Sequence, residues 1–366
     1  MKRVYLHEIA TVVPEHSYTQ EFALDFQLDL ICKTDKQRKF LQKVYEGSAI
    51  YKRHTVIGDY GKDPKDFTFY PKNRSLKPEP STKKRNDLYI KESNRLSLQA
   101  TNKLLELLPA HIRNSISHLI TVSCTGFSAP GFDLHLIKEL RLDPSIDRFH
   151  LGFMGCYAAF PAMKMAQNIC MVNPAARVLI VNVELCSLHY KQTFEPEIVV
   201  SNAIFSDGIT ACLVSSDKDD SDGKRILLHS FLSKYLQGSE DLMAWKIGEY
   251  GFDMTLSHYV PDLINRNINS IMSDLFDKVQ IGKDDIDIWA IHPGGKAILK
   301  KLEESLGLDR DNFSFSYDVL WEYGNMSSST IFFVLEKILR SNEKGNIISA
   351  AFGPGLTVEV GYMEIV

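Results

Sequence analysis

Apolar runs with β-strand character alternate with stretches of helical spacing along most of this chain, and this alternation most constrains its fold. Typical runs are 118–123 and 177–183, which are rich in β-branched and aliphatic residues. Strands that alternate with helices form a sheet covered by helices, so we predict an α/β fold. The alternation occurs twice, which predicts two layered halves of similar architecture, residues 1–216 and 217–366.

The predicted elements follow from this periodicity and from Gly and Pro punctuation. We predict strands at 3–9, 118–123, 148–153, 177–183, 208–215, 286–291, 346–352 and 357–365. We predict helices at 19–32, 35–46, 87–108, 132–140, 156–171, 296–305 and 325–339. The polar, proline-containing segment 58–85 is predicted to be a long loop, and loops of that length are often functional covers. Residues 217–223 are predicted to be a solvated linker between the halves.

The composition excludes several classes of protein. With 42 Lys and Arg against 46 Asp and Glu, the net charge is −4, which gives no overall attraction to nucleic acid or to an anionic membrane. The six cysteines form no C-x-x-C pair, which argues against a zinc site or a redox pair and is typical of reduced thiols. No signal peptide and no apolar run of about 18–20 residues is recognised. We therefore expect a cytoplasmic protein without nucleic-acid or membrane partners.

A cysteine opens a predicted helix directly after a predicted strand. In the sequence Gly155-Cys156-Tyr157 the glycine turns the chain, and the positive end of a helix favours thiolate over thiol. This position favours a nucleophile, although a buried core cysteine is the default for any single Cys.

Two further polar residues stand at turns of the same kind. His292 follows an apolar strand and precedes Pro293-Gly294-Gly295, and Asn325 stands at the start of a predicted helix. A turn histidine and a helix N-cap are the ordinary roles of such residues. Together with Cys156, however, they stand where this architecture can direct side chains into one pocket.

With these three residues at their turns, the chain resembles the type III polyketide synthases. This chalcone-synthase-like family has a thiolase fold of duplicated, layered αβαβα halves. The matching stretches are 123–126, 155–156, 204–208, 292–295, 324–328 and 352–357. The stretch 241–254 is more similar to bacterial members than to plant ones. The resemblance implies an acyltransferase that forms a homodimer.

The resemblance also implies a chemistry. Cys156 would be acylated by a starter acyl-CoA, and malonyl-CoA would extend the chain by decarboxylative Claisen condensation, followed by cyclisation to a small aromatic or pyrone product. His292 would hold the thiolate as an imidazolium–thiolate pair, and His292 and Asn325 would donate to the thioester oxygen. Because decarboxylation generates the carbanion, neither a metal nor another cofactor is expected.

The resemblance assigns pocket residues as well. Phe205 matches a gatekeeper between the CoA tunnel and the cavity, although a core Phe is a serious alternative. Met254 replaces a second gatekeeper Phe, and Trp245 replaces a small residue, so the cavity should be trimmed. The remaining residues that line the cavity are expected to be Thr193, Cys124, Ser327 and Pro354. Cys124 is equally explained as a thiol packed in the core.

The basic residues of 33–53 are the candidates for binding CoA phosphates. We expect contacts from Lys43 and Arg53, while a solvated helix face explains most of the other charges. Two alternative functions stay open: a ketoacyl synthase III-like enzyme that makes one condensation with an acyl carrier protein, and a non-catalytic ketosynthase-like partner. The stretches around Asn325 and Pro354 favour the polyketide synthase.

Overall fold

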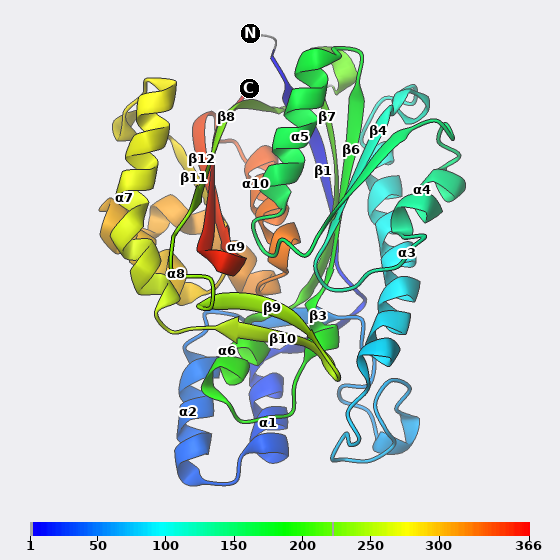
Figure 1. Ribbon diagram of the computed structural model, residues 1–366, viewed down its shortest axis with the longest axis vertical. Helices are drawn as coiled ribbons and strands as arrows, with labels where there is room; N and C mark the ends of the chain where they lie inside the picture. Colours follow the sequence, from blue (N-terminus) through cyan, green and yellow to red (C-terminus); the bar gives the residue numbers. More distant parts are fainter. Residues whose placement is uncertain (1–2, 222) are drawn as a thin grey trace.

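The computed structural model describes residues 3–221 and 223–366 and confirms the α/β class (Figure 1). Its strands are β1 (Tyr5–Val12), β2 (His16–Thr19), β3 (Lys52–Thr55), β4 (His118–Ser123), β5 (Asp147–Gly152), β6 (Arg177–Leu185), β7 (Asp207–Ser215), β8 (Ile226–Tyr235), β9 (Met243–Gly248), β10 (Gly251–Leu256), β11 (Ile288–Ile291), β12 (Gly345–Gly353) and β13 (Thr357–Ile365). Its α-helices are α1 (Gln20–Ile31), α2 (Asp35–Glu46), α3 (Thr82–Glu106), α4 (Phe132–Leu140), α5 (Ala159–Val172), α6 (Pro196–Ile204), α7 (Val260–Val279), α8 (Lys296–Leu306), α9 (Ser314–Tyr323) and α10 (Thr330–Arg340).

Nine strands form one sheet in the order β11-β12-β13-β8-β1-β7-β6-β4-β5. From β1 outward, β1 and β7 are antiparallel, β7 and β6 are antiparallel, and β6 and β4 are parallel. From β8 outward, β8 and β13 are antiparallel, β13 and β12 are antiparallel, and β12 and β11 are parallel, which is the same succession. The topology therefore repeats although the sequence shows no repeat, and a short antiparallel pairing of β1 with β8 joins the two parts.

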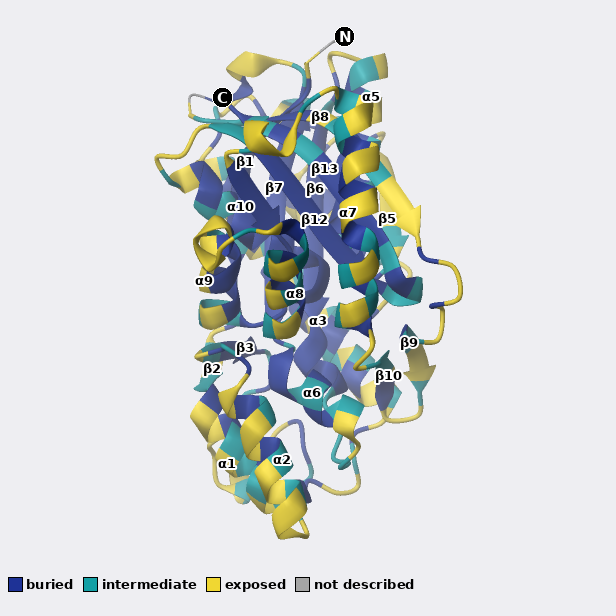
Figure 2. Ribbon diagram, turned by 90° about the vertical axis from the view of Figure 1, so that its left-hand side faces the viewer, coloured by how far each residue is buried: buried dark blue, intermediate teal, exposed yellow. Residues whose placement is uncertain are grey.

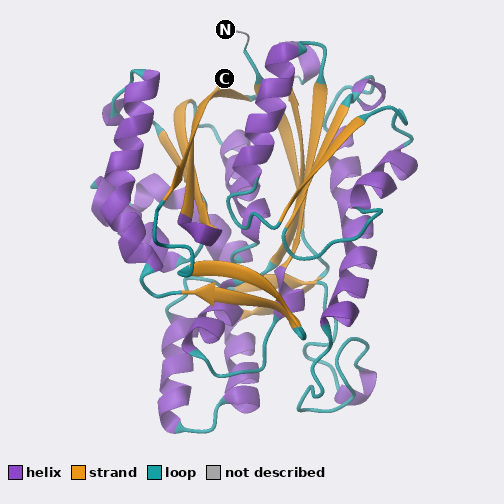
Figure 3. Cartoon of the chain, in the orientation of Figure 1, coloured by secondary structure: helices purple, strands orange, loops and turns teal. Residues whose placement is uncertain are grey.

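The sheet and helices form five layers (Figures 1 and 3). Helices α5 and α10 lie between the two parts of the sheet, α3 and α4 cover one outer face, and α7 and α8 cover the other. The central position of α10 follows from its sequence, because Ile331–Leu335 is apolar all round and all five side chains are buried (Figure 2). No helix of the described residues is long and apolar enough to cross a membrane.

A smaller region lies below the layers, at the end of the molecule away from both termini (Figure 1). It contains α1, α2, α6, the β2–β3 ribbon and the β9–β10 hairpin. The turn of the hairpin is docked on the start of α3, since Thr82 N donates to Glu249 O at 2.8 Å and Gly251 N donates to Thr82 Oγ1 at 2.8 Å. The hairpin is thereby held across the end of the central layers.

Several predicted boundaries are wrong, each for a local reason. Helix α3 begins five residues before the predicted position, because the Ser81 hydroxyl accepts from Lys84 N and caps it. Helix α5 begins at Ala159 and not at Cys156, because residues 155–158 form a turn that Ala158 N closes on Gly155 O. Helix α10 begins at Thr330, five residues after Asn325. Periodicity also missed α6, α7, α9 and the strands β2, β3, β8, β9 and β10.

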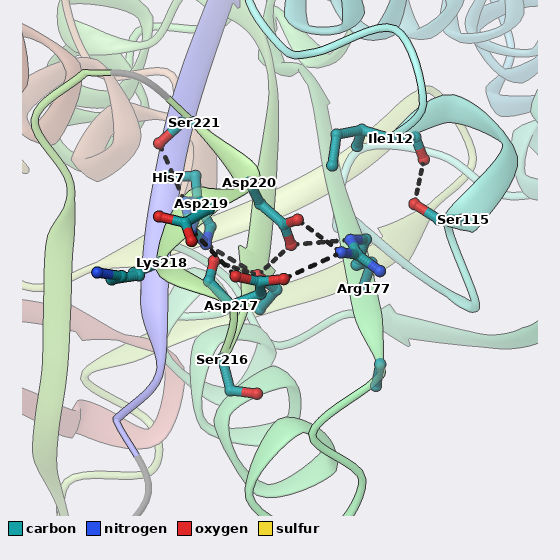
Figure 4. A network of polar contacts seen from close by, with 12 residues as sticks. His7, Ile112, Ser115, Arg177, Ser216, Asp217, Lys218, Asp219, Asp220 and Ser221 are labelled. Atoms are coloured by element: carbon teal, nitrogen blue, oxygen red, sulfur yellow. Dashed lines mark hydrogen bonds and ion pairs between the residues drawn. The ribbon is translucent and has the colours of Figure 1, made fainter.

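The predicted linker between the halves is anchored and not freely solvated (Figure 4). Buried His7 of β1 contacts Ser215 Oγ at 2.9 Å and Ser221 Oγ at 3.1 Å, and Arg177 donates to Asp220 at 2.7 and 2.8 Å. Burial lowers the pKa of His7 to about 4, so the imidazole is neutral and acts as a hydrogen-bonding spacer. The network fixes the crossover at the end of the sheet remote from Cys156.

Candidate active site

Cys156 lies in a tight turn between β5 and α5. Phe153 and Gly155 have φ values of 57° and 78°, and Ala158 N closes the turn on Gly155 O at 3.0 Å. A Cβ on Gly155 would lie 2.3 Å from Pro354 Cδ, so only glycine fits between this turn and the segment after β12. Pro354 thus packs against the turn that contains Cys156.

Gly155→Ala is expected to destabilise the protein by more than 2 kcal/mol and to abolish activity, because it combines positive φ with a clash at Pro354. Gly355→Ala is the matched control: its φ is 70° but nothing lies within 4 Å of the added Cβ, so only about 1 kcal/mol should be lost. Thermal melting and product formation measure both variants. Equal losses of stability would contradict the close-packing argument.

His292 follows β11 in a buried turn. Its backbone N–H donates to Ala350 O at 2.8 Å, while neither ring nitrogen has a hydrogen-bond partner among the described residues. Burial lowers the pKa of His292 to about 3. Burial likewise raises the pKa of Cys156 to about 12, against opposing contacts from Ser327 and Asn325. Each group by itself is therefore held neutral, with an imidazole free to accept or donate.

Asn325 connects the three segments. Its Nδ2 donates to Gly294 O at 3.2 Å, in the turn after His292, and its Oδ1 accepts from Ser327 N at 2.8 Å. Its backbone pairs with the Phe205 segment, since Asn325 N donates to Ile204 O and Ser206 N donates to Asn325 O, both at 2.9 Å. Asn325 is therefore not a helix N-cap: it sits where the His292 turn, the Phe205 segment and the contacts of Cys156 meet.

A buried carboxylate beside the cysteine was missed by the sequence analysis. Glu184 of β6 accepts from Ser328 Oγ at 2.5 Å, Thr125 Oγ1 at 3.1 Å and Cys124 N at 3.1 Å, and the Cys124 thiol lies 3.3 Å from it. Cys124 also contacts Ser327 Oγ at 3.2 Å, and Ser327 opposes the burial that raises the pKa of Cys156. The predicted site residues Cys124 and Ser327 thus lie between this carboxylate and Cys156. A glutamate within an apolar strand was the only sequence signal.

Glu184→Gln is expected to remove part of the pH dependence of folding. Burial raises the pKa of Glu184 from 4.5 to about 7, so its contribution to stability is fully present below pH 4.5 and is lost as the pH rises through 7. Relative to wild type, the variant should therefore gain up to about 3 kcal/mol between pH 5 and pH 8. Urea unfolding at both pH values measures this gain. Asp207, whose pKa burial also raises to about 7, is present in both proteins and cancels. Parallel pH slopes would contradict the assignment.

A pocket adjoins these residues on the far side of Phe205. Its wall includes Phe205, Trp245, Met254, His189 and Cys186, whereas Cys156, His292 and Asn325 do not line it. Phe205 thus lies in the wall of this pocket, while its backbone pairs with that of Asn325. Trp245 is fixed by donating from Nε1 to Cys124 O at 2.7 Å, and it packs with His189 and Phe252.

Two predicted binding residues, Thr193 and Arg53, lie elsewhere than expected, whereas Lys43 is exposed as expected. Thr193 is not in this pocket: the turn of residues 186–189 after β6 occupies the wall, and Thr193 lies in a separate surface hollow with Leu30 and Lys33. Lys43 is exposed on α2. Arg53 is buried in the pocket wall and donates to Asn202 O at 2.6 Å and Phe205 O at 2.9 Å, so it does not present a surface for a CoA phosphate.

The duplicated five-layered fold, with a buried cysteine, histidine and asparagine at turns that meet, defines a thiolase-fold condensing enzyme. The family models for the N-terminal and C-terminal domains of chalcone and stilbene synthases match residues 3–218 and 227–366. The chain belongs to this family of type III polyketide synthases, which are acyltransferases.

Individual relatives agree with this membership. The chain is 32% identical to the alpha-pyrone synthesis polyketide synthase-like Pks18 of Mycobacterium tuberculosis, over 98% of this chain and 90% of the relative. It is 28% identical to type III polyketide synthase C of Arabidopsis thaliana, over 96% and 91% of the two chains. The structure of 1,3,6,8-tetrahydroxynaphthalene synthase from Streptomyces coelicolor A3(2) superposes with a TM-score of 0.86 at 27% identity, covering 98% of this chain and 99% of that one. That of PKS-I from the brown alga Ectocarpus siliculosus gives 0.89 at 28% identity, covering 100% and 98%.

Proposed function

We propose that Cys156 accepts an acyl group from an acyl-CoA starter and that malonyl-CoA extends it by decarboxylative condensation, before cyclisation to a small phenol or pyrone. The observation that carries this proposal is the convergence at Asn325, whose carboxamide bonds to the His292 turn and lowers the pKa of the buried Cys156 thiol. A nucleophile with amide and imidazole donors beside it suits thioester chemistry.

Each step of the proposed reaction balances with these residues. The Cys156 sulfur attacks the starter thioester and CoA thiol leaves with a proton. Malonyl-CoA then loses CO2, and the electron pair of the broken C–C bond forms an enolate whose oxygen accepts hydrogen bonds from His292 and Asn325. The enolate carbon attacks the Cys156 thioester, releases the Cys156 thiolate and leaves the extended chain on CoA. One such oxyanion donor contributes roughly 3–4 kcal/mol of transition-state stabilisation. We propose that no metal and no other cofactor takes part.

CoA and a second subunit are the proposed partners. Lys43, with Lys36 and Lys39 on the same exposed helix, offers ammonium groups for the CoA phosphates. For the homodimer, β5 supplies the support: it ends the sheet, pairs only with β4 among the described strands and exposes Phe149. An open, partly apolar edge is suited to pairing with a second copy. We also propose a cytoplasmic location.

Product analysis tests the proposal. The protein is incubated with malonyl-CoA, with and without a series of acyl-CoA starters, and products are identified by mass spectrometry. Cys156-dependent phloroglucinol-, alkylresorcinol- or alkylpyrone-type products are expected, and their masses give the starter and the number of extensions. A single ketoacyl condensation that requires a malonyl carrier protein would support a ketoacyl synthase III-like enzyme instead. No product in either assay would contradict both.

Trp245→Gly is expected to lengthen the products by at least one malonyl unit, because Trp245 occupies the pocket wall beside Phe205 and Met254. The same mass-spectrometric assay measures the change. Trp321→Gly, which removes an exposed tryptophan from α9, is the control for loss of an indole. An unchanged product profile in Trp245→Gly would show that this side chain does not limit chain length.

A further inference from the structure

The pocket beside Phe205 continues into a second cavity between α1, the end of α2 and Tyr60. The two cavities share Tyr18, Arg53, Tyr60, Tyr190 and Asn202, so they adjoin along this set of residues. We call the second cavity the tyrosine chamber. It is lined by Tyr18, Phe22, Ala23, Phe26, Gln27, Tyr45, Arg53, Tyr60, Tyr190 and Asn202.

Arg53 brings a positive charge to the boundary between the two cavities. Arg53 is buried, and the hydrogen bonds that it donates end on neutral oxygens. Its Nε donates to Gln20 Oε1 at 3.0 Å, and its Nη1 donates to the carbonyls of Asn202 and Phe205. Within residues 3–221 and 223–366 no carboxylate lies within ion-pair distance of Arg53. Buried charges are normally paired, so this guanidinium is an unusual group to leave in an aromatic cavity.

The neighbouring charges do not supply its counterion. Asp207 lies within electrostatic reach, but burial raises its pKa to about 7, and its oxygens accept from Ser187 and from Val56 N. Lys191, the other cation of the pocket wall, is paired with Asp253 at 2.7 Å. The charge of Arg53 is therefore the one uncompensated charge at this boundary within the described chain.

The chamber also contains buried oxygens without partners. In the described parts of the chain, Tyr45 Oη, Tyr190 Oη and Gln27 Oε1 are all buried and reach no hydrogen-bond partner. Tyr45 lies against Arg53, whose guanidinium carbon is 6.0 Å from the centre of its ring. A buried polar atom without a partner costs about 1–3 kcal/mol, and three around one cavity indicate a site that a polar ligand completes.

We propose that the tyrosine chamber, whose volume is about 30 Å³, accepts a single anionic oxygen. This is the oxygen of an enolate or phenolate of the polyketide chain or its cyclised product, held by Arg53 and by the hydroxyls of Tyr45 and Tyr190. The assignment of the ligand class rests on the proposed function. Poly-β-keto chains enolise, and their 4-hydroxypyrone and resorcinol products carry acidic hydroxyls. The guanidinium supplies the positive charge, and the two tyrosine hydroxyls of the same cavity wall are hydrogen-bond donors for an oxygen anion.

The test uses a matched pair of probes and is a binding experiment. 4-Hydroxy-6-methyl-2-pyrone, an enol acid that is ionised at neutral pH, and its uncharged 4-methyl ether are titrated into the full-length protein by isothermal calorimetry. The hydroxypyrone is expected to bind at least 10-fold more tightly than the ether. Tyr45→Phe and Tyr190→Phe should each weaken its binding by about 5- to 20-fold.

The same variants separate a ligand site from a structural defect. Removal of a hydroxyl that has no partner should leave the melting temperature unchanged or raise it, so weaker binding would not reflect unfolding. Tyr89→Phe is the matched control, since Tyr89 Oη is also buried without a partner but lies outside both cavities. It should leave the affinity for the hydroxypyrone unchanged. Arg53→Gln is not used in this test, because it would also remove the hydrogen bonds to the carbonyls of Asn202 and Phe205 and could disturb the fold.

Equal binding of the two probes, or an unchanged affinity in both Tyr45→Phe and Tyr190→Phe, would overturn the proposal and leave the chamber as a site for water. Its failure is distinct from that of the proposed function. Polyketide products with no selectivity between the probes would retain the synthase and remove the subsite. Selective, tyrosine-dependent binding without any polyketide product would retain the subsite and remove the proposed reaction.

Discussion

Cys156→Ala is expected to lower polyketide formation by at least about 1000-fold while decarboxylation of malonyl-CoA continues. Loading and condensation both require the sulfur, since the chain is attached to it in each step. Decarboxylation requires only the donors to the thioester oxygen, and Asn325 and His292 keep their backbone anchors when the sulfur is removed. Release of 14CO2 from labelled malonyl-CoA, measured beside product formation, distinguishes the two activities.

Two variants complete this experiment. Asn325→Ala should lower decarboxylation itself by about 100- to 1000-fold, because it removes an oxyanion donor. Cys212→Ala, at a buried thiol of β7 remote from these residues, should retain both activities within about twofold. If Cys156→Ala still makes product, Cys156 is not the site of acyl attachment. If Asn325→Ala decarboxylates normally, the donor role assigned to its carboxamide is wrong.

The layered core could be predicted from the sequence because it depends on local periodicity. The run at 118–123 is apolar and β-branched, and 132–140 has helical spacing; β4 and α4 have those bounds in the structure. Helix α7 is strongly amphipathic and was nevertheless missed, as were β9 and β10, whose short pairing depends on each other and on the start of α3. Short strands that pair outside the main sheet carry little local signal.

The residues of the candidate site likewise fall into those with a local sequence signal and those without one. Cys156, His292 and Asn325 were recognised because each stands at a glycine-containing turn, and the structure joins the His292 and Asn325 turns through Gly294. Glu184 and His189 were not recognised, because their environment is created by contacts across the fold: His189 contacts Thr125 O at 2.7 Å and accepts from Phe252 N at 3.0 Å. Thr193 lines a separate surface hollow and not the pocket beside Phe205. Arg53 was identified as a cation, but its burial could not be read from the neighbouring lysines.

Iodoacetamide inactivation through Cys156 is expected to be nearly constant between pH 6 and pH 8, and at pH 6.5 to be about 100-fold faster than for a thiol with a pKa of about 8.5. Burial of each group alone acts in the opposite direction, since it raises the pKa of Cys156 and lowers that of His292. However, a single proton transfer from sulfur to imidazole creates two opposite charges together, and their mutual attraction offsets the cost of burying each one. The imidazole also has no other partner within the described chain, so the thiolate would satisfy one of its nitrogens.

The chain contains its own reference for this measurement. Cys32, at the end of α1, is only partly buried, and burial raises its pKa, so its alkylation should rise about tenfold per pH unit. Peptide mass spectrometry reads both cysteines in one sample. His292→Ala should convert the flat profile of Cys156 into a steep one parallel to that of Cys32. If wild-type Cys156 already follows the slope of Cys32, the resting pair is neutral, as burial alone favours. The thiolate would then form only when a bound thioester brings the sulfur and imidazole together, which makes substrate binding, and not the free protein, the step that activates the nucleophile.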